Sequence, residues 1–581
     1  MTRRTVFVKA LVLAAFLIIL FRLVDIMLID HDRYKGIAKL QRTIGKRVLF
    51  RRGVIYDRNG KELAINLERP SLYCDPKLIK KPEKVAVTLT DLIGRPKAEI
   101  LRSIRQNRRF VWLARKVPPR VAEKIERFGF GGIGILPDTK RFYPMGFVGA
   151  HVLGFVDLDN RGKEGVERVY NKELIGDLKN SLNKRIYLKR DARGNLLYTG
   201  GELESTGNSI VLTIDQGLQA IVESALDDVV KKHSPEAASV ILMDPYTGEI
   251  LALANRPTFD PNEPGSYRAS FRRNRAVTDL YEPGSTFKIV MASAALEEGI
   301  ATLKTKVDCS GGVIEVAGKK IRDTHKHGKL TLKEIIQKSS NVGAVKVALE
   351  LGPDRFFRYV QKYGFGQKTG IDLTGESPGI VKPPSRWSGT TLAAMAIGYE
   401  VMVTPIQVLN AYAVVANGGY RVRPHVLKAV LSKDGQLIRV INSTMGERVI
   451  SEKTAIQLKE AFKAVVSRDG TAPKAAIDGN TVAGKTGTTK LIDPKTGRYT
   501  NRHFVSSFVG MVPVERPVFV AIVVVWDPKN AYYGGDVAAP VFREIAEKAL
   551  AYLSVPREDN LKEHILVYNL DEDITPVGYV Q

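Results

Sequence analysis

The feature that most constrains this chain is an apolar segment close to its N-terminus. Residues 6–29 are mostly apolar, and a charge-free core runs over 10–21. A removable signal peptide needs a small-residue cleavage site after such a run, and the residues after Phe21 offer none. Arg3 and Arg4 precede the segment, so its basic end is expected in the cytoplasm. We therefore expect residues 1–30 to form a signal-anchor in the cytoplasmic (inner) membrane, with the rest of the chain outside the cytoplasm.

The anchor carries two charges near its outer end. Arg22 and Asp25 are three residues apart, a spacing that brings two side chains together on one face of a helix. Charged side chains are costly in lipid, and a helical membrane partner would shield them. The sequence has no second apolar run long enough to span a membrane, which favours a single-pass protein.

The net charge narrows the class of partner. The 581-residue chain has 88 Lys and Arg against 62 Asp and Glu, a net charge of +26. Such a surplus favours a polyanion: nucleic acid, anionic lipid or an anionic cell-surface polymer. Because the anchor exports the chain, we expect no nucleic acid among its partners. The two cysteines, Cys74 and Cys309, form neither a disulfide framework nor a zinc pattern.

Composition divides the exported part of the chain. Residues 31–205 are strongly basic, with strand-like runs among glycines and prolines, and a shift at Gly200-Gly201 opens a compact α/β unit over 206–555. Residues 556–581 are expected to form a C-terminal tail. Within the second unit, hydrophobic periodicity and turn residues predict a strand at 210–214, a helix at 216–232, a hairpin of 239–243 with 249–253, and a buried strand at 518–525.

The strongest chemical signal is the stretch Glu282-Pro-Gly-Ser-Thr-Phe-Lys288. Pro283-Gly284 breaks the preceding structure and the following apolar spacing is helical, so Ser285 starts a helix with Lys288 on the same face. An ordinary serine N-cap is the simpler explanation, but a lysine in the first turn opposes the helix dipole by about 0.3–1 kcal/mol. A buried, neutral Lys288 can take the hydroxyl proton of Ser285, and the N–H groups of the helix start can stabilise an oxyanion.

A second motif, Ser339-Ser-Asn341, ends a helical stretch over 332–338. A serine hydroxyl can relay a proton, and an asparagine amide can hold a substrate amide. A polar corner between two helices explains the motif equally well when it stands alone. Ser181-Leu-Asn-Lys184 matches parts of both motifs in a basic stretch, and we interpret that copy as chance.

A third motif, Lys-Thr-Gly, occurs three times, beginning at Lys368, Lys485 and Lys495. Only the Lys485 copy lies among small residues in what reads as an edge strand, where glycine lets a substrate backbone approach closely. The other two copies follow turn residues and are expected in surface loops.

Together, the three motifs in this order resemble the set found in the penicillin-binding transpeptidases. Further stretches resemble the monofunctional, class B members of that family: 52–60, 141–144, 162–167, 274–276, 404–407 and 532–540. The resemblance implies an α/β (α+β) fold, an antiparallel sheet flanked by helices, on an elongated, non-catalytic pedestal of the dimerisation type.

The resemblance also implies a D,D-transpeptidase that attacks the D-alanyl-D-alanine end of a peptidoglycan stem peptide and is inhibited by β-lactams. Neither a metal nor an organic cofactor is implied. The implied catalytic residues are the nucleophile Ser285, the base Lys288, and the relay and lysine-orienting pair Ser339 and Asn341. The implied carboxylate-binding strand consists of Lys485, Thr486, Gly487 and Thr488. The backbone N–H groups of Ser285 and Thr488 would form the oxyanion hole.

The residues before the nucleophile favour one cellular role. Glu282 directly before Pro283 is similar to the FtsI-like septal group, whereas elongation enzymes more often carry another proline there. The resemblance therefore implies a septal enzyme that works with an FtsW-type membrane glycan polymerase and other division proteins. An elongation enzyme of the side wall with a RodA-like polymerase is the alternative.

Two acidic residues near the motifs have less certain roles. Glu282 is placed where it could pair with a pedestal arginine. Glu400 occupies a position at which relatives often have glycine, so the conformation of the surrounding loop is open.

Other classes of protein are less consistent with the sequence. A bifunctional transpeptidase needs a Glu-Asp-x-x-Phe stretch, and the sequence has none between residues 30 and 205. A β-lactamase needs a Glu-x-x-Leu-Asn stretch, and the sequence has none between Asn341 and Lys485. A D,D-carboxypeptidase usually lacks the pedestal, and a β-lactam sensor needs several membrane spans. The intact set of motifs argues against an inactive division scaffold.

Overall fold

The computed structural model describes most of the chain, which falls into two compact units. The described residues are 3–30, 43–45, 51–176, 187–190, 196–198, 207–442, 445–493 and 496–559. The first unit comprises Met1–Arg52, Asn66–Lys140 and Ile175–Gly207, and the second comprises Gly53–Ile65, Arg141–Leu174 and Asn208–Gln581. The second unit takes in two segments of the predicted pedestal, 53–65 and 141–174, and the domain boundaries given above stay a prediction. Lys184 and Lys495 lie outside the described residues.

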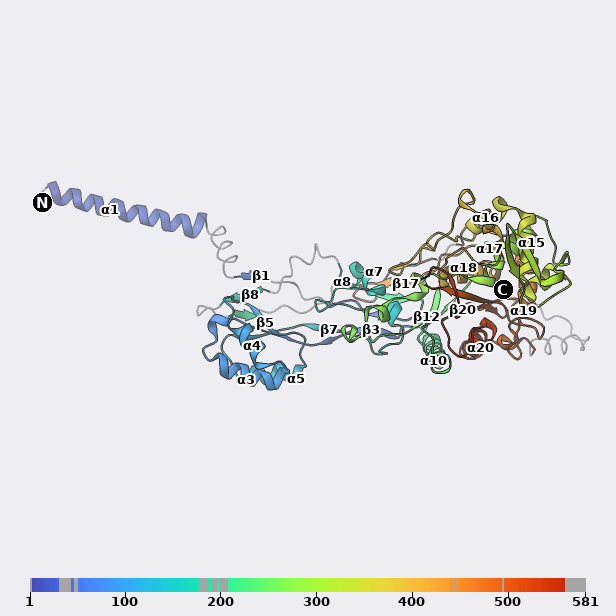
Figure 1. The fold of residues 1–581 in the computed structure, drawn as a ribbon. Helices are drawn as coiled ribbons and strands as arrows, with labels where there is room; N and C mark the ends of the chain where they lie inside the picture. Colours follow the sequence, from blue (N-terminus) through green and yellow to red (C-terminus); the bar gives the residue numbers. More distant parts are fainter. Residues whose placement is uncertain are drawn as a thin grey trace, which may run out of the picture. The chain divides into compact units, whose positions relative to one another are not determined.

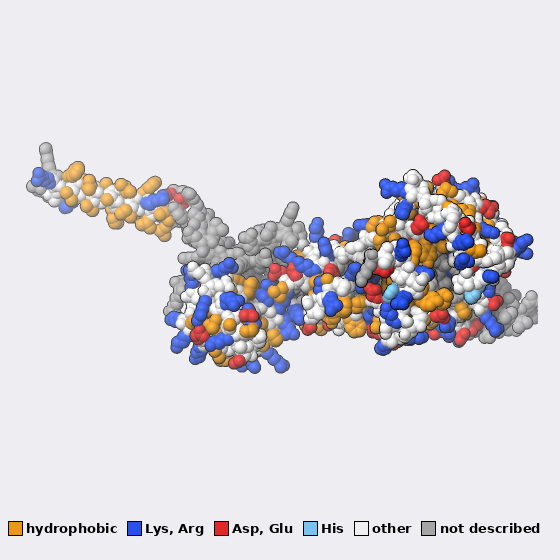
Figure 2. All heavy atoms as spheres, viewed as in Figure 1, with side chains coloured by type: hydrophobic (Ala, Val, Ile, Leu, Met, Phe, Trp, Pro, Cys, Tyr) orange, Lys and Arg blue, Asp and Glu red, His pale blue; other side chains and the backbone are white. Residues whose placement is uncertain are grey.

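The N-terminal apolar segment forms one long helix. Helix α1 spans Arg3–Val24 and continues into a π-helical turn over Asp25–Ile29. The stretch Arg4–Leu28 has a mean hydropathy of 2.7 and is not buried within the chain. Its surface is almost continuously hydrophobic, with basic side chains at the N-terminal end (Figure 2). Arg22 and Asp25 form the ion pair that their spacing predicts. By length and composition, the helix can cross a bilayer.

The first unit contains an antiparallel sheet packed with helices (Figure 1). The sheet has the order β5-β4-β6, with bounds Val111–Ala114, Ser71–Cys74 and Ile133–Leu136. The helices that share its apolar core are α3 (Pro82–Ile93), α4 (Lys97–Ile104) and α5 (Pro119–Arg127). A second sheet has the order β1-β8-β9, with bounds Thr43–Gly45, Tyr187–Arg190 and Leu196–Tyr198.

The second unit is built on a five-stranded antiparallel sheet with the order β12-β11-β21-β20-β19. The bounds are β11 (Ala237–Met243), β12 (Ile250–Arg256), β19 (Ala483–Ile492), β20 (Tyr499–Val512) and β21 (Phe519–Trp526). The predicted hairpin is confirmed as β11–β12, and the predicted buried strand is confirmed as β21. Strand β19, which carries Lys485, lies at the edge of the sheet.

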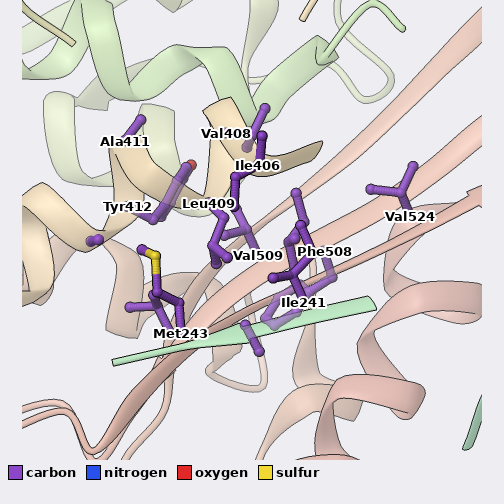
Figure 3. Close-up of a cluster of buried hydrophobic side chains, with 14 of the residues drawn as sticks. Ile241, Met243, Ile406, Val408, Leu409, Ala411, Tyr412, Phe508, Val509 and Val524 are labelled. Atoms are coloured by element: carbon purple, nitrogen blue, oxygen red, sulfur yellow. The ribbon is translucent and has the colours of Figure 1, made fainter. Parts of the chain in front are cut away.

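Helices pack against both faces of this sheet, so strands β11 and β21 are buried along their whole length. Strand β21 is a continuous run of apolar residues, and β11 is apolar except for Ser239, as expected where both faces of a sheet are covered. Helix α18 (Pro405–Ala416) is wholly buried, and its side chains Ile406, Leu409 and Tyr412 lie among those of β11, β20 and β21 (Figure 3). Helix α20 (Gly534–Tyr552) packs on the other side, with Phe542 against Phe508 of β20 (Figure 1).

The remaining elements of the second unit surround this sheet. The helices are α6 (Ala150–Leu153), α7 (Gly165–Val169), α8 (Asn171–Ile175), α10 (Gln216–His233), α11 (Ala269–Arg272), α12 (Arg275–Thr278), α13 (Lys288–Glu297), α14 (Leu332–Gln337), α15 (Asn341–Leu351), α16 (Pro353–Lys362), α17 (Thr391–Ala396) and α19 (Glu452–Val466). A six-stranded sheet includes β2 (Ile55–Tyr56), β10 (Ser209–Leu212), β17 (Leu427–Leu431) and β18 (Leu437–Val440). Four short strands before the second motif are β13 (Lys306–Asp308), β14 (Val313–Val316), β15 (Lys319–Arg322) and β16 (Lys329–Thr331).

A buried ion pair joins three of the stretches that resemble class B enzymes. Arg141 Nε donates to Glu167 Oε1 at 2.6 Å, and Arg141 Nη1 donates to Gly53 O at 2.8 Å. Both charged side chains are almost completely shielded from solvent. Removing one partner of such a pair would leave an uncompensated buried charge. The arrangement explains why Gly53 and Arg141, both assigned to the predicted pedestal, belong to the second unit.

Candidate active site

Ser285 lies at the start of a helix, as its sequence context predicts. Gly284–Phe287 form one 3₁₀ turn that continues directly into α13. Gly284 takes a left-handed conformation, φ +57°, and its N–H donates to Gly398 O at 3.1 Å. A Cβ atom at Gly284 would lie 2.6 Å from a methyl group of Thr489 on β19. Glycine therefore allows the turn to pack this closely against the edge strand.

Lys288 is wholly buried and contacts four oxygen atoms. Its Nζ atom lies 2.7 Å from Ser339 O, 3.3 Å from Ser339 Oγ, 3.1 Å from Ser340 O and 2.9 Å from Asn341 Oδ1. Burial lowers the pKa of the Lys288 ammonium to about 7, while the negative charge of Asp323 acts in the opposite direction. A sizeable fraction of Lys288 is therefore neutral near pH 7 and able to accept a proton.

Ser339 connects the two motif lysines to Ser285. Its hydroxyl donates to Ser285 Oγ at 2.8 Å and accepts from Lys485 Nζ at 3.0 Å. Its backbone is left-handed, with φ +58°, a conformation that is uncommon for a residue other than glycine. The confirmed helix α14 ends just before Ser339, and α15 begins at Asn341. The turn between these two helices therefore delivers the hydroxyl to Ser285.

Lys485 lies on β19 and is fully buried. Burial lowers the pKa of Lys485 well below its usual value, and the nearby charge of Lys288 lowers it further. Its neighbours on the strand are also held in place: Thr486 Oγ1 lies 2.9 Å from Thr471 Oγ1, and Thr488 Oγ1 accepts from the N–H of Gly534 at 2.9 Å. The edge strand thus presents a buried lysine and two fixed hydroxyl groups.

Gly487 allows the edge strand and the nucleophile turn to meet. A Cβ atom at this position would lie 2.4 Å from Ser507 Oγ and 2.7 Å from Pro283 O. Real side chains do not come this close, so a larger residue at 487 would push β19 away from the turn that carries Ser285. The third motif therefore has a structural reason for its glycine as well as for its lysine.

The other predicted copies of the motifs do not join this cluster where the structure describes them. Lys368 is exposed in the loop after α16, as predicted for a surface copy. In the part of the chain that the structure describes, no group of three or more His, Cys, Asp or Glu side chains is placed to hold a metal ion.

Two family models match the chain. The penicillin binding protein transpeptidase domain matches residues 238–547, which carry Ser285, Ser339 and Lys485. The penicillin-binding protein dimerisation domain matches residues 49–212. The chain belongs to the class B penicillin-binding proteins. It is accordingly a serine-type transpeptidase, and the predicted fold class is confirmed.

Relatives extend along nearly the whole length of this class B penicillin-binding protein. Stage V sporulation protein D of Bacillus subtilis is 34% identical over 97% of this chain and 88% of its own. Peptidoglycan D,D-transpeptidase FtsI of Escherichia coli K12 is 32% identical over 94% of this chain and 91% of its own. The crystal structure of penicillin binding protein 3 from Mycobacterium tuberculosis, complexed with aztreonam, is 28% identical with a TM-score of 0.67, and the match covers 88% of this chain and 97% of that one.

The motifs of this penicillin-binding protein did not indicate Asp323. This residue directly follows β15 and contacts the segment that begins α15. It is separated in sequence from the motifs by an exposed loop, so no periodic pattern or motif spacing connects it with them. A lone acidic residue between two short strands is not a signal that sequence reasoning can use.

Glu282 has different partners from the pedestal arginine that its position suggested. Its Oε1 atom accepts from the N–H of Glu400 at 2.9 Å and from the hydroxyl of Tyr499 at 2.9 Å. Thr489 Oγ1 donates to Glu282 O at 2.9 Å. Burial is the largest cause of the raised pKa of the Glu282 carboxyl. The residue therefore links the nucleophile turn to β19, to β20 and to the loop that carries Glu400.

Glu400 itself occupies a conformation that favours glycine. Its φ is +58°, in the left-handed region where a Cβ atom costs about 1–2 kcal/mol. A glycine at this position would relieve that strain. The side chain of Glu400 also takes part in a hydrogen bond, because Thr391 Oγ1 donates to Glu400 Oε2 at 2.9 Å.

The strain at Glu400 predicts an unusual order of stabilities. Glu400→Ala loses the hydrogen bond to Thr391 and keeps the unfavourable φ, whereas Glu400→Gly loses the same bond and relieves the φ. At an ordinary position alanine is the more stabilising residue. Here we expect Glu400→Gly to be more stable than Glu400→Ala by about 1 kcal/mol, measured by thermal unfolding of the soluble domain. An alanine variant equal to or more stable than the glycine variant would contradict this interpretation.

Proposed function

We propose that this class B penicillin-binding protein cross-links peptidoglycan stem peptides at the division septum through an acyl-enzyme on Ser285. The observation that carries the chemistry is the continuous set of contacts from Lys288 through Ser339 to Ser285, closed by Lys485 on the edge strand. A serine that only capped a helix would need neither a wholly buried lysine nearby nor a second hydroxyl, that of Ser339, in contact with both Lys288 and Lys485.

In the first half of the reaction, Ser285 Oγ attacks the carbonyl carbon of the penultimate D-alanine. Neutral Lys288 acts as the base, and the hydroxyl of Ser339 passes the proton from Ser285 Oγ toward Lys288 Nζ. The tetrahedral intermediate places its oxyanion on the N–H groups of Ser285 and Thr488. When the intermediate collapses, the terminal D-alanine leaves with the proton on its amine, and the stem peptide remains as an ester of Ser285.

The strand that includes Gly487 positions the donor peptide in this proposal. An extended peptide adds to an exposed sheet edge through its main chain, and β19 is such an edge. Lys485, Thr486 and Thr488 receive the C-terminal carboxylate of the donor. Asn341, whose Oδ1 lies 2.9 Å from Lys288 Nζ, orients the base and holds an amide of the substrate.

In the second half of the reaction, the amine of a neighbouring stem peptide attacks the ester carbonyl. The same base removes the proton from the attacking amine and returns it to Ser285 Oγ, so the serine is regenerated and one new peptide bond replaces the one that was broken. This step balances without a metal or an organic cofactor.

Mass spectrometry of the soluble domain after benzylpenicillin treatment tests the nucleophile. β-Lactams carry a reactive amide that the same serine opens, so we expect one adduct per chain and a modified peptide that contains Ser285. The physical reason is the base one helical turn away, which raises the nucleophilicity of this hydroxyl alone. An adduct on a peptide containing Ser181, or no adduct on folded protein, would refute the assignment.

The septal role rests on Glu282 before Pro283, and the membrane anchor supplies the docking surface for a membrane partner. We propose that α1 docks against an FtsW-type glycan polymerase, since the Arg22–Asp25 pair lies in a stretch that otherwise meets lipid. Other division proteins would join the same assembly. The partner polyanions of the basic chain are then the wall polymer and the membrane surface.

Depletion of the protein from growing cells separates the two cellular roles. A septal enzyme is needed only for division, so we expect filamentous cells with unfinished septa while elongation continues. Microscopy and labelling of new wall would measure cell length and septum number. Round, wide cells would instead support an elongation enzyme of the side wall that works with a RodA-like polymerase.

A further inference from the structure

The carboxylate of Asp323 accepts hydrogen bonds from residues at the start of α15. Its Oδ1 atom accepts from the N–H of Asn341 and from the N–H of Val342, the latter at 2.9 Å. Its Oδ2 atom accepts from Ser340 Oγ at 2.8 Å. The neighbouring Arg322 O accepts from Asn341 Nδ2 at 3.0 Å. The end of β15 therefore binds the second motif through Arg322 and Asp323, and we call these two residues the bracket.

This bracket acts on a segment that needs support. Ser339 has φ +58°, and such a conformation persists only when the surrounding structure determines it. The oxygens that contact Lys288 belong to Ser339, Ser340 and Asn341. A carboxylate at the N-terminus of α15 also interacts favourably with the helix dipole. Two of the three residues that contact Lys288 are thus bound directly to Asp323.

We propose that Asp323 is a positioning residue for acylation, whose carboxylate holds the Ser339–Asn341 segment in the conformation that binds Lys288. The inference rests on the proposed function of Ser285 and adds to it a residue outside the three motifs. Asp323 does not touch the serine that reacts. It acts through Ser340 and Asn341, and through its negative charge.

The charge of Asp323 provides a readout that a purely structural role would lack. The charged group that acts on Lys288 is Asp323 after β15, and the charge of Lys288 acts in turn on Lys485 of β19. Asp323 favours the protonated form of Lys288 and so raises its pKa. Removing the charge lowers that pKa, and Lys288 then becomes neutral at a lower pH. The rise of the acylation rate with pH must move in the same direction.

The experiment measures the second-order rate constant for acylation by a fluorescent penicillin across a range of pH. The variants are Asp323→Asn and, as a matched control, Asp308→Asn. Asp308 is exposed, and its side chain accepts from the N–H of Ser310. We expect Asp323→Asn to lower the rate constant at high pH about tenfold or more and to shift the midpoint of the pH profile to lower pH. The control should stay within about twofold of the unmodified chain at an unchanged midpoint.

Each other result overturns the proposal. A rate constant for Asp323→Asn within twofold of the unmodified chain means that the bracket is not needed, and a lower rate with an unmoved midpoint means that Asp323 is only structural. If Asp323→Asn does not fold, Ser340→Ala decides, because it removes one donor and keeps the charge. We then expect a rate several-fold lower at the original midpoint, and an unchanged rate overturns the proposal. Failure of the proposed function is distinguishable, since the unmodified chain would then form no adduct on Ser285.

Discussion

Replacing Lys288 by alanine is expected to lower the acylation rate constant with a fluorescent penicillin about 10³-fold. General bases contribute about 10²–10⁴-fold in enzymes, and Lys288 is the base in the proposed reaction. The contacts of Lys288 Nζ with Ser339 and Asn341 also orient the relay, so both the proton acceptor and the geometry are lost. The matched control is Lys304→Ala, since Lys304 is exposed in the loop after α13.

The pH dependence of the same rate constant checks the protonation state. Burial lowers the pKa of Lys288 to about 7, so Lys288 is protonated and inactive as a base below that pH and neutral above it. We therefore expect the rate to rise as the pH increases through about 7 and to level off above it. A rate that stays constant between about pH 5 and 9, or a Lys288→Ala variant within tenfold of the unmodified chain, would exclude Lys288 as the base.

The second large effect concerns the three Lys-Thr-Gly copies. We expect Lys485→Ala to lower the acylation rate constant about 100-fold, because charge-assisted hydrogen bonds to a buried carboxylate contribute about 1.5–3 kcal/mol and Ser339 loses a donor as well. Lys368 is exposed in a loop, and surface substitutions away from special features change free energies by about 0.5 kcal/mol or less. Lys368→Ala should therefore react within about twofold of the unmodified chain.

The Lys495→Ala variant extends this comparison to a copy that lies outside the described residues. It is predicted to behave as Lys368→Ala does, since its sequence context is a turn. Thermal unfolding of all three variants separates loss of chemistry from loss of fold. If either loop variant is as slow as Lys485→Ala while it remains folded, the assignment of the third motif to β19 is incorrect.

Local patterns in the sequence determined much of this protein. The apolar run from residue 6 predicts α1, and the breaks at Pro283-Gly284 place Ser285 at a helix start. The hairpin of β11 with β12 follows from two mostly apolar strands around a Pro and Gly turn. These features are predictable because capping, turn and periodicity rules act over a few residues.

Tertiary structure decided how the motifs meet. Ser339 is 54 residues from Ser285 and 146 residues from Lys485, and no local rule sets the distances among their side chains. The fold also placed Glu282 against Glu400 and Tyr499, and it brought Asp323 to the start of α15. It joined Arg141 to Glu167 and so moved part of the predicted pedestal into the second unit.

The features that the sequence predicts and those that only the tertiary structure sets differ because sequence patterns reflect local interactions. Strand pairing and helix starts depend on neighbouring residues, so they leave a periodic trace in the sequence. The buried environment that lowers the pKa of Lys288, and the left-handed backbone of Ser339 and Glu400, arise only when distant segments pack and exclude water. The sequence therefore predicts which residues carry the chemistry, and the packing of α13, α15 and β19 determined how close together they lie.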